Sequence, residues 1–329
     1  MPTRSYQIRH SLYLLLTAIV WGTSFVSQRS AMQTQLGGFT FNAIRLIIGS
    51  LVLIPFILFI RKKEGIKNWE EPKRKAYNKA TIIGGIICGV ILCLASNLQQ
   101  FGIKGISAGK TGFITALYII EVPIIGLFLK KKTSWLLAVA VPMAVGGMFL
   151  LCMVGETFTF GVSEWLVLAC SVVYSIHILA IDYFAPKTDG VLMSSIQFFV
   201  AGIISLILMF ITETPTIEGI LDCKFQILYS GIMACGVAYT FQILGQKNMN
   251  PTVSSLILSL ESTVSVLSGW IILHEELSLY QALGCVVMFI AIIIAQLPSN
   301  IFQILFKKKK IVEDNAEEEV KGEEQCEQQ

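Results

Sequence analysis

Ten long apolar segments dominate this sequence and restrict the folds that are open to it. An α-helix needs about 20 mostly apolar residues to cross the hydrocarbon core of a bilayer. Segments that meet this requirement cover residues 11–31, 39–60, 80–98, 109–129, 134–153, 162–183, 191–211, 225–244, 252–273 and 279–297. Charged residues make up only 14% of the 329 positions, too few for the surface of a soluble protein. The sequence therefore predicts an all-α integral membrane protein with ten transmembrane helices.

Basic residues are divided unevenly between the two sides of such a bundle. Twenty of the 25 Lys and Arg fall on the side that holds the N-terminus, and four fall on the other side. Because cytoplasmic segments carry the excess of positive charge, we expect both termini in the cytoplasm and the chain in the cytoplasmic membrane. The basic clusters adjoin apolar segments, which favours lipid headgroups over nucleic acid as their partner. The one long connection, residues 61–79, is expected to lie along the membrane surface.

The second half of the chain repeats the first. Residues 99–104 (QQFGIK) and 242–247 (QILGQK) share Gln, Gly and Lys at a constant offset of 143. Upstream the offset widens slightly, and two more pairs of segments align: residues 42–45 (NAIR) with 194–197 (SSIQ), and 21–22 (WG) with 174–175 (YS). A common register across several helices in the same order indicates an internal duplication. The first apolar segment resembles a signal peptide, but its counterpart in the second half favours a retained helix.

Each half contains five predicted helices, and an odd number inverts the second half relative to the first. The predicted organisation is a cytoplasmic N-terminus (1–10), two inverted five-helix repeats (11–154 and 155–298) and a charged tail (299–329), which its composition predicts to be disordered. Inverted repeats related by a pseudo-two-fold axis in the membrane plane are typical of secondary transporters.

Four short segments carry a resemblance to the EamA-type transporters of the drug/metabolite transporter superfamily. They are residues 21–25 (WGTSF), 41–45 (FNAIR), 107–109 (SAG) and 259–261 (SLE). Their order and spacing extend the resemblance over residues 12–297. Where the family pattern often continues Leu-Glu-Pro, Ser262 follows here. The resemblance implies a ten-helix transporter of a small metabolite, and it does not identify the substrate.

Ionisable residues inside the predicted helices are candidates for the transport pathway, because each costs about 2.5–3.5 kcal/mol at the membrane centre. Glu261 aligns with Tyr118 at the offset of 143, and Glu121 shares a helix face with Tyr118. We expect both glutamates to face one cavity and to be able to carry a proton. Arg45 could bind an anionic group of the substrate, or an ion pair with a glutamate could merely hold helices together. His177 fits a packing residue as well as a proton relay.

Polar and aromatic residues complete the predicted site. Gln99 and Gln242 occupy equivalent positions and could bind the substrate or bridge helices. Asn42, one turn before Arg45, belongs to the same candidate pathway. Four aromatic residues are expected to form cavity walls: Trp21, Tyr118, Tyr174 and Tyr239.

The motifs favour a transporter over other classes of membrane protein. The chain has no serine-protease, HExxH or Walker A signature, and its eight cysteines show no metal-binding spacing. No cofactor, metal or nucleic acid is therefore expected. The predicted function is secondary transport of a small metabolite, amino acid-like or amphiphilic, with efflux as the expected direction and protons as the candidate coupling ion. The alternatives are an intramembrane enzyme and a membrane scaffold or receptor.

Overall fold

The computed structural model describes residues 4–63, 65–130, 135–152, 161–273 and 278–296. Every regular element in these ranges is helical. Seven segments of the described chain are long and apolar enough to cross a membrane, and two further apolar helices, Trp135–Leu150 and Leu279–Ala295, are shorter. Together with the segment 251–273, they occupy all ten predicted positions. The predicted tail from residue 299 onward lies outside the described residues.

The first repeat contains eight elements, several of which combine into one membrane-spanning segment. They are α1 (Arg4–Met32), α2 (Gly38–Val52), α3 (Ile54–Lys63), η1 (Ile66–Asn68), α4 (Glu71–Gly102), α5 (Ala108–Thr115), α6 (Tyr118–Phe128) and α7 (Trp135–Cys152). We call the end of the bundle that holds the start of α1 the N-terminal face, and the other end the opposite face.

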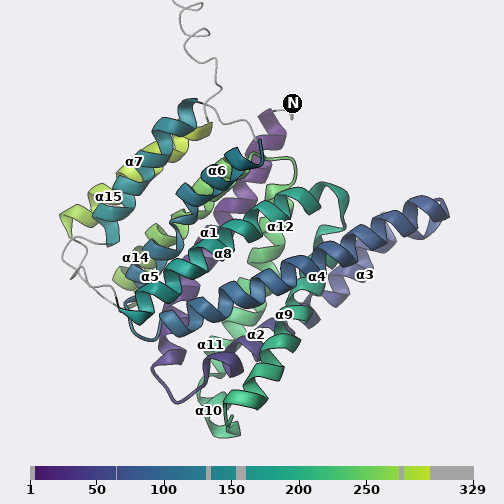
Figure 1. Ribbon diagram of the computed structural model, residues 1–329, viewed down its shortest axis with the longest axis horizontal. Helices are drawn as coiled ribbons and strands as arrows, with labels where there is room; N and C mark the ends of the chain where they lie inside the picture. The colour runs from purple at the N-terminus through teal and green to yellow at the C-terminus, as the bar shows by residue number, and fades with distance from the viewer. Residues whose placement is uncertain (1–3, 64, 131–134, 153–160, 274–277, 297–329) are drawn as a thin grey trace, which may run out of the picture.

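The second repeat follows the same plan. Its elements are α8 (Val162–Phe184), η2 (Ala185–Lys187), α9 (Gly190–Thr212), α10 (Ile217–Asp222), α11 (Lys224–Tyr229), the π-helix η3 (Ser230–Tyr239), α12 (Thr240–Gln246), α13 (Pro251–Leu258), α14 (Leu260–Leu273) and α15 (Leu279–Gln296). The last helix of each repeat, α7 and α15, pack side by side at one edge of the bundle (Figure 1).

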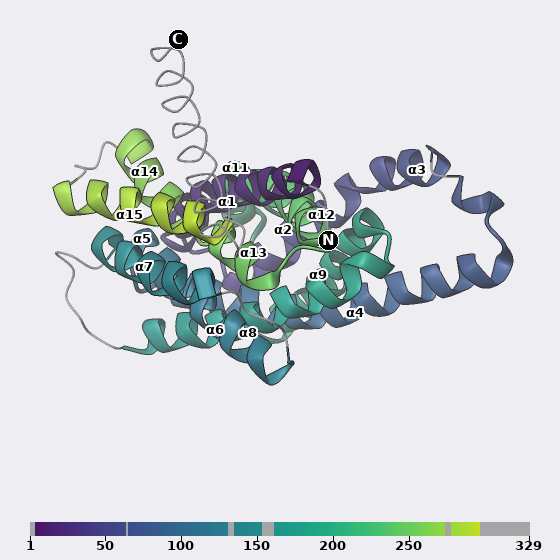
Figure 2. The same cartoon turned by 90° about the horizontal axis from the view of Figure 1, so that it is seen from above.

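The long connection in the first repeat differs from the sequence prediction. Residues 71–79, expected on the membrane surface, instead form the first turns of α4. The 32 residues of α4 span about 48 Å, more than the roughly 30 Å of hydrocarbon. Viewed from above, α3 and the start of α4 extend away from the rest of the bundle (Figure 2). Between α3 and α4, the backbone of Gly65 is left-handed (φ 61°), a conformation that suits glycine.

Close contacts at two glycines show that equivalent helices of the two repeats pack in the same way. A Cβ atom on Gly102 would lie 3.0 Å from the carbonyl oxygen of Ser163 on α8, and one on Gly245 would lie 3.0 Å from that of His10 on α1. Gly102 and Gly245 are related by the offset of 143, and His10 and Ser163 by the offset of 153 that relates the first helices of the two halves. The glycine of each half therefore packs closely against the first helix of the other half, at an equivalent position.

A second pair of glycines locates a one-residue shift in the register. A Cβ atom on Gly89 would lie 2.8 Å from Val200, and one on Gly231 would lie 2.9 Å from Ile48. Here the glycines are related by 142, one less than further along the chain. The π-helix η3 begins at this point, and a π-helical turn accommodates an extra residue. The second repeat therefore absorbs a single insertion within η3.

Equivalent helices run in opposite directions. Ser50 of α2 donates a hydrogen bond to the carbonyl oxygen of Ser195 on α9 (2.9 Å). At the other end of this pair, Glu213 accepts from the backbone N–H of Thr40 (2.8 Å). The helices α2 and α9 are thus antiparallel, and they are the second helix of each repeat. The fold consists of two inverted five-helix repeats, as the sequence predicts.

Candidate functional site

A break in the same place interrupts the fourth membrane segment of each repeat. Helix α5 ends before Ala116 and helix α13 ends before Ser259, and these two residues are related by the offset of 143. After each break a new helix begins, α6 at Tyr118 and α14 at Leu260. Discontinuous helices near the membrane centre are where secondary transporters place their binding sites.

The residues that follow the two breaks meet each other. The Tyr118 hydroxyl donates a hydrogen bond to Glu261 Oε1 (2.9 Å), and both residues are buried, at 2% and 3% exposure. They are also the pair that the offset of 143 relates. Two equivalent residues can touch only where the pseudo-two-fold axis passes between them. The Tyr118–Glu261 hydrogen bond therefore marks this axis in the interior of the bundle.

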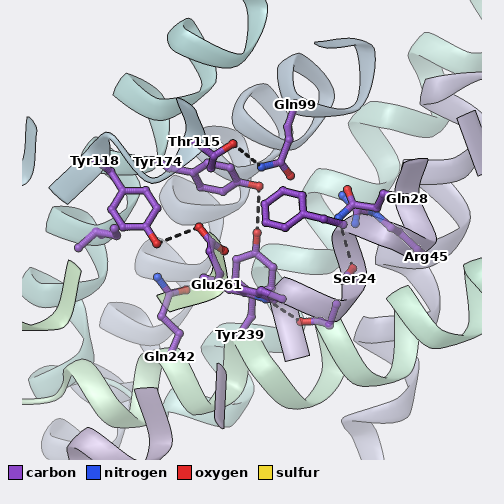
Figure 3. Close-up of a pocket in the computed structure, with 14 residues that line it drawn as sticks. Ser24, Gln28, Arg45, Gln99, Thr115, Tyr118, Tyr174, Tyr239, Gln242 and Glu261 are labelled. Atoms are coloured by element: carbon purple, nitrogen blue, oxygen red, sulfur yellow. Dashed lines mark hydrogen bonds between the residues drawn. The ribbon is translucent and has the colours of Figure 1, made fainter. Parts of the chain in front are cut away.

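A cavity lies at the axis, and Figure 3 shows the side chains that line it. Its 14 lining residues are Trp21, Ser24, Phe25, Gln28, Arg45, Gln99, Thr115, Tyr118, Tyr174, Ile178, Ala234, Tyr239, Gln242 and Glu261. The cavity volume is about 30 Å³, enough for about two water molecules. A metabolite would therefore require the lining side chains to move apart.

Eight of the lining residues form four equivalent pairs, one member from each repeat. The pairs are Trp21 with Tyr174, Phe25 with Ile178, Gln99 with Gln242, and Tyr118 with Glu261. The cavity thus has a symmetric centre to which both repeats contribute. Secondary transporters with inverted repeats place their substrate sites at such an interface between the repeats.

Aromatic side chains form one wall of the cavity. The hydroxyl groups of Tyr174 and Tyr239 are hydrogen-bonded at 3.1 Å, and the ring of Trp21 lies 4.5 Å from that of Tyr239, centre to centre. Trp21 Nε1 also donates to the carbonyl oxygen of Ala234 (3.3 Å). The wall therefore offers apolar ring faces together with hydroxyl groups that can exchange their partner for a ligand.

Arg45 brings the positive charge of the cavity. Its Nε donates to Asn42 Oδ1 (2.7 Å), and its guanidinium carbon lies 5.3 Å from the centre of the Phe41 ring. Within the described residues, Arg45 forms no ion pair with Glu121 or Glu261, so the predicted alternative of a structural ion pair is not present. In Figure 3, Arg45 and Glu261 lie on opposite sides of the tyrosine pair.

Glu121 and His177 lie outside the cavity lining, although both belong to the candidate pathway predicted with Glu261. The Glu121 carboxylate accepts hydrogen bonds from Ser171 (2.9 Å) and Ser175 (2.6 Å), both on α8. His177 Nε2 lies 3.2 Å from Gln197 Oε1. The expectation that both glutamates face one cavity is wrong for this conformation, because two serine hydroxyl groups hold Glu121 against α8.

The structure brings eight of the eleven predicted site residues together in the cavity lining: Trp21, Arg45, Gln99, Tyr118, Tyr174, Tyr239, Gln242 and Glu261. Of the other three, Asn42 accepts a hydrogen bond from Arg45 Nε. Sequence reasoning missed Ser24 and Gln28, which follow Trp21 by three and seven residues and so share its helix face. Extending the polar face of this helix from Trp21 would have found them.

Sequence reasoning also missed a buried ion pair between the repeats. Lys110 Nζ lies 2.7 Å from Glu164 Oε1, and each side chain is only 7% exposed. The sequence places Lys110 beside a loop, where a solvated side chain is the usual expectation. In the structure, it lies in the first turn of α5 and faces the first turn of α8 at the opposite face.

Comparison with known proteins agrees with this architecture. The EamA-like transporter family matches the chain twice, over residues 9–153 and 162–296. A crystal structure of a protein resembles the fold with a TM-score of 0.69 and 16% sequence identity, over 89% of this chain and 97% of that one. At this identity, the likeness concerns the fold alone.

Curated relatives match most of this chain at modest identity. An uncharacterized transporter of Archaeoglobus fulgidus is 26% identical over 301 residues, covering 87% of this chain and 85% of that protein. The uncharacterized transporter YoaV of Bacillus subtilis is 20% identical over 85% of this chain and 94% of its own length. The WAT1-related protein At3g02690, chloroplastic, of Arabidopsis thaliana is 24% identical over 85% of this chain and 67% of its own length. With both repeats matched, this chain is a multi-pass membrane protein that belongs to the EamA-like transporter family of the drug/metabolite transporter superfamily.

Proposed function

We propose that this protein exports a small amino acid-like or amphiphilic metabolite across the cytoplasmic membrane by alternating access, with protons as the coupling ion. The observation that carries the proposal is the hydrogen bond between the equivalent residues Tyr118 and Glu261, within a cavity on the pseudo-two-fold axis. Such a site can be exposed to either side when one set of helices rocks against the other. The excess of Lys and Arg on the N-terminal side supports cytoplasmic termini.

The chemistry of the cavity supports the substrate class. The Arg45 guanidinium can bind a carboxylate, and the Glu261 carboxyl can accept a hydrogen bond from an amino group or take up a proton. The aromatic wall suits an apolar side chain. An amphiphilic metabolite with a carboxylate at one end fits this arrangement of groups.

The small volume of the cavity supports a conformational cycle. About 30 Å³ is far below the roughly 300–1,000 Å³ of a typical ligand site. Loading must therefore separate lining groups that now touch, such as the hydroxyl groups of Tyr174 and Tyr239. Proton coupling follows from Glu261, because a neutral carboxyl group tolerates closure of the cavity around it better than a carboxylate does.

Counterflow in proteoliposomes tests the proposal. Vesicles that contain the purified protein are loaded with pools of amino acids, nucleosides or amphiphilic cations, and uptake of labelled members of the same pool is followed. We expect flux with the amino acid pool and none in protein-free vesicles. Absence of flux with every pool, for correctly folded protein, would contradict transport.

A single substitution tests proton coupling. Glu261→Gln keeps the shape of the side chain and removes its titration, so an imposed pH gradient should no longer drive accumulation while exchange continues. Glu218→Gln is the matched control, because Glu218 is exposed on α10. Equal gradient-driven accumulation by Glu261→Gln and the parent protein would rule out coupling through this residue.

A further inference from the structure

The cavity is symmetric at its centre and asymmetric at its rim. Besides the four equivalent pairs, the first repeat contributes Ser24, Gln28, Arg45 and Thr115 to the lining. Ser24 and Gln28 lie between Trp21 and the end of α1, which is the opposite face. This polar extension therefore reaches from the centre of the cavity toward the opposite face only.

The equivalent positions in the second repeat do not line the cavity. At offsets of 153, 152 and 143, the four counterparts are His177, Ile181, Gln197 and Leu258. The glycine contacts support the first two offsets directly, because the packing partners of Gly102 and Gly245 differ by 153 and those of Gly89 and Gly231 differ by 152. The counterparts lie on the side of the cavity toward the N-terminal face, since α8 runs there after Tyr174.

His177 and Gln197 are buried polar residues with unused hydrogen-bonding groups. Both side chains have 0% exposure. Their one described side-chain hydrogen bond joins them, His177 Nε2 to Gln197 Oε1 at 3.2 Å, while His177 Nδ1 and Gln197 Nε2 have no hydrogen-bond partner among the described residues. The His177 ring also lies edge-on to the rings of Tyr174 and Tyr239, with ring centres 6.4 and 6.1 Å away. A buried polar atom without a partner destabilises the conformation that leaves it unpaired. A second conformation that provides partners for these two nitrogen atoms would remove this destabilisation.

We propose that His177 and Gln197 form a second half-site, which lines the cavity toward the N-terminal face in the alternate conformation. There the pair takes the place that Ser24 and Arg45 hold in the present structure. This inference rests on the proposed function, because alternating access through an inverted repeat exchanges the environments of equivalent residues.

The chemistry of the half-site defines its ligand group. The Gln197 oxygen only accepts hydrogen bonds, so the His177 nitrogen that faces it must be the protonated one. This bond fixes the amide and leaves the Gln197 NH₂ group free to donate. Its equivalent, Arg45, also presents N–H donors to the cavity. The same acceptor group of the substrate, a carboxylate in the class proposed above, therefore meets N–H donors from Arg45 in one state and from Gln197 in the other.

Accessibility to a thiol reagent tests the location of the half-site without a substrate. In a cysteine-free version of the full chain, Gln28→Cys and Ile181→Cys place single thiols at equivalent positions beside the two half-sites. A charged, membrane-impermeant methanethiosulfonate is added to either side of oriented proteoliposomes. We expect Gln28→Cys to react only from the side of the opposite face and Ile181→Cys only from the side of the N-terminal face.

A disulfide cross-link between α2 and α9 tests whether the labelling of Ile181→Cys requires these helices to move. Ser50 and Ser195 lie on α2 and α9 with their hydroxyl oxygens 3.1 Å apart, so a pair of cysteines there should form a disulfide. Oxidation should hold the helices as in the present structure and reduce labelling of Ile181→Cys at least tenfold, and reduction should restore it. If Ile181→Cys fails to react from the N-terminal side, or reacts at the same rate with the cross-link closed, the half-site does not exist.

Flux measurements on the same vesicles test recognition. Gln197→Leu should lower counterflow of the amino acid pool at least tenfold. Gln100→Leu is the matched control, since Gln100 is equally buried but lies outside both half-sites, and it should retain flux within a factor of two. Parental flux by Gln197→Leu would overturn the assignment. If the parent protein shows no flux while Ile181→Cys still switches, the proposed function fails and the alternate lining stands.

Discussion

The buried ion pair between α5 and α8 permits a quantitative test of how the repeats are joined at the opposite face. Lys110 Nζ lies 2.7 Å from Glu164 Oε1 with both side chains 7% exposed, and Glu164 Oε2 also accepts from the backbone N–H of Gly161 (2.9 Å). Lys110→Met keeps most of the side-chain volume and removes the charge. The Glu164 carboxylate then keeps its bond to Gly161 but loses its cation.

The expected cost follows from the geometry of the pair. Hydrogen bonds to charged groups contribute about 1.5–3 kcal/mol, and removing one partner of a buried pair costs about 3–5 kcal/mol because a charge is left uncompensated. The pair lies at helix ends rather than at the centre of the bundle, so we expect about 3 kcal/mol, or roughly 150-fold in the unfolding equilibrium. Glu164→Gln should cost a similar amount. The double variant Lys110→Met/Glu164→Gln should lose less than the sum of the two single variants.

Reversible unfolding in mixed detergent micelles, followed by tryptophan fluorescence, measures these differences. Lys75→Met is the control, because Lys75 pairs with Glu71 on the surface of α4 with 75% and 62% of the side chains exposed. Exposed pairs of this kind contribute little, so the control should match the parent protein. The Lys110–Glu164 pair does not stabilise the protein if Lys110→Met is no more destabilising than Lys75→Met, or if the effects of the two single variants simply add.

Three further predictions concern packing, the axis and the N-terminal face. Gly102→Ala and Gly245→Ala should each lower the thermal unfolding temperature by several degrees, because the added Cβ would meet a carbonyl oxygen at 3.0 Å in both places; an unchanged temperature would contradict the packing. Tyr118→Phe should slow counterflow at least tenfold with little change in unfolding temperature, because it removes only the hydroxyl that binds Glu261, and parental flux would count against a role for this bond. Asp189→Asn should cost about 1 kcal/mol in the same unfolding assay, because it removes the charge that faces the end of α3 but keeps a side chain that can cap α9; a loss above about 3 kcal/mol would show a stronger connection.

The internal repeat explains why much of the fold and part of the site could be predicted from the sequence. Hydropathy locates the ten segments, and their odd number per repeat requires the inversion. The offset of 143 by itself pairs Tyr118 with Glu261. That the two residues touch depends on the position of the axis, and the axis is a property of the packed bundle that no local pattern contains.

Other features of the fold leave no mark on the hydropathy averaged over a window of residues. The breaks at Ala116 and Ser259 fall on small residues inside apolar segments, so hydropathy continues across them without a change. The π-helix η3 likewise has no hydropathy signal, and only the one-residue change of register indicates it. Helical spacing places Glu121 on the same face as Tyr118, but a face is broad enough to contact α8 as well as the cavity.

The asymmetry between equivalent interfaces bears on how the bundle can move. Ser175 of α8 donates a hydrogen bond to Glu121 of α6 (2.6 Å). The equivalent positions are Gly22 of α1 and Val264 of α14, where a Cβ atom on the glycine would lie only 2.5 Å from the valine Cβ. Hydroxyl and carboxylate groups can exchange each other for water when an interface opens, whereas close apolar packing loses its contacts without replacement. The interface between α6 and α8 is therefore the less costly one to open, although the two interfaces occupy equivalent places in the repeats.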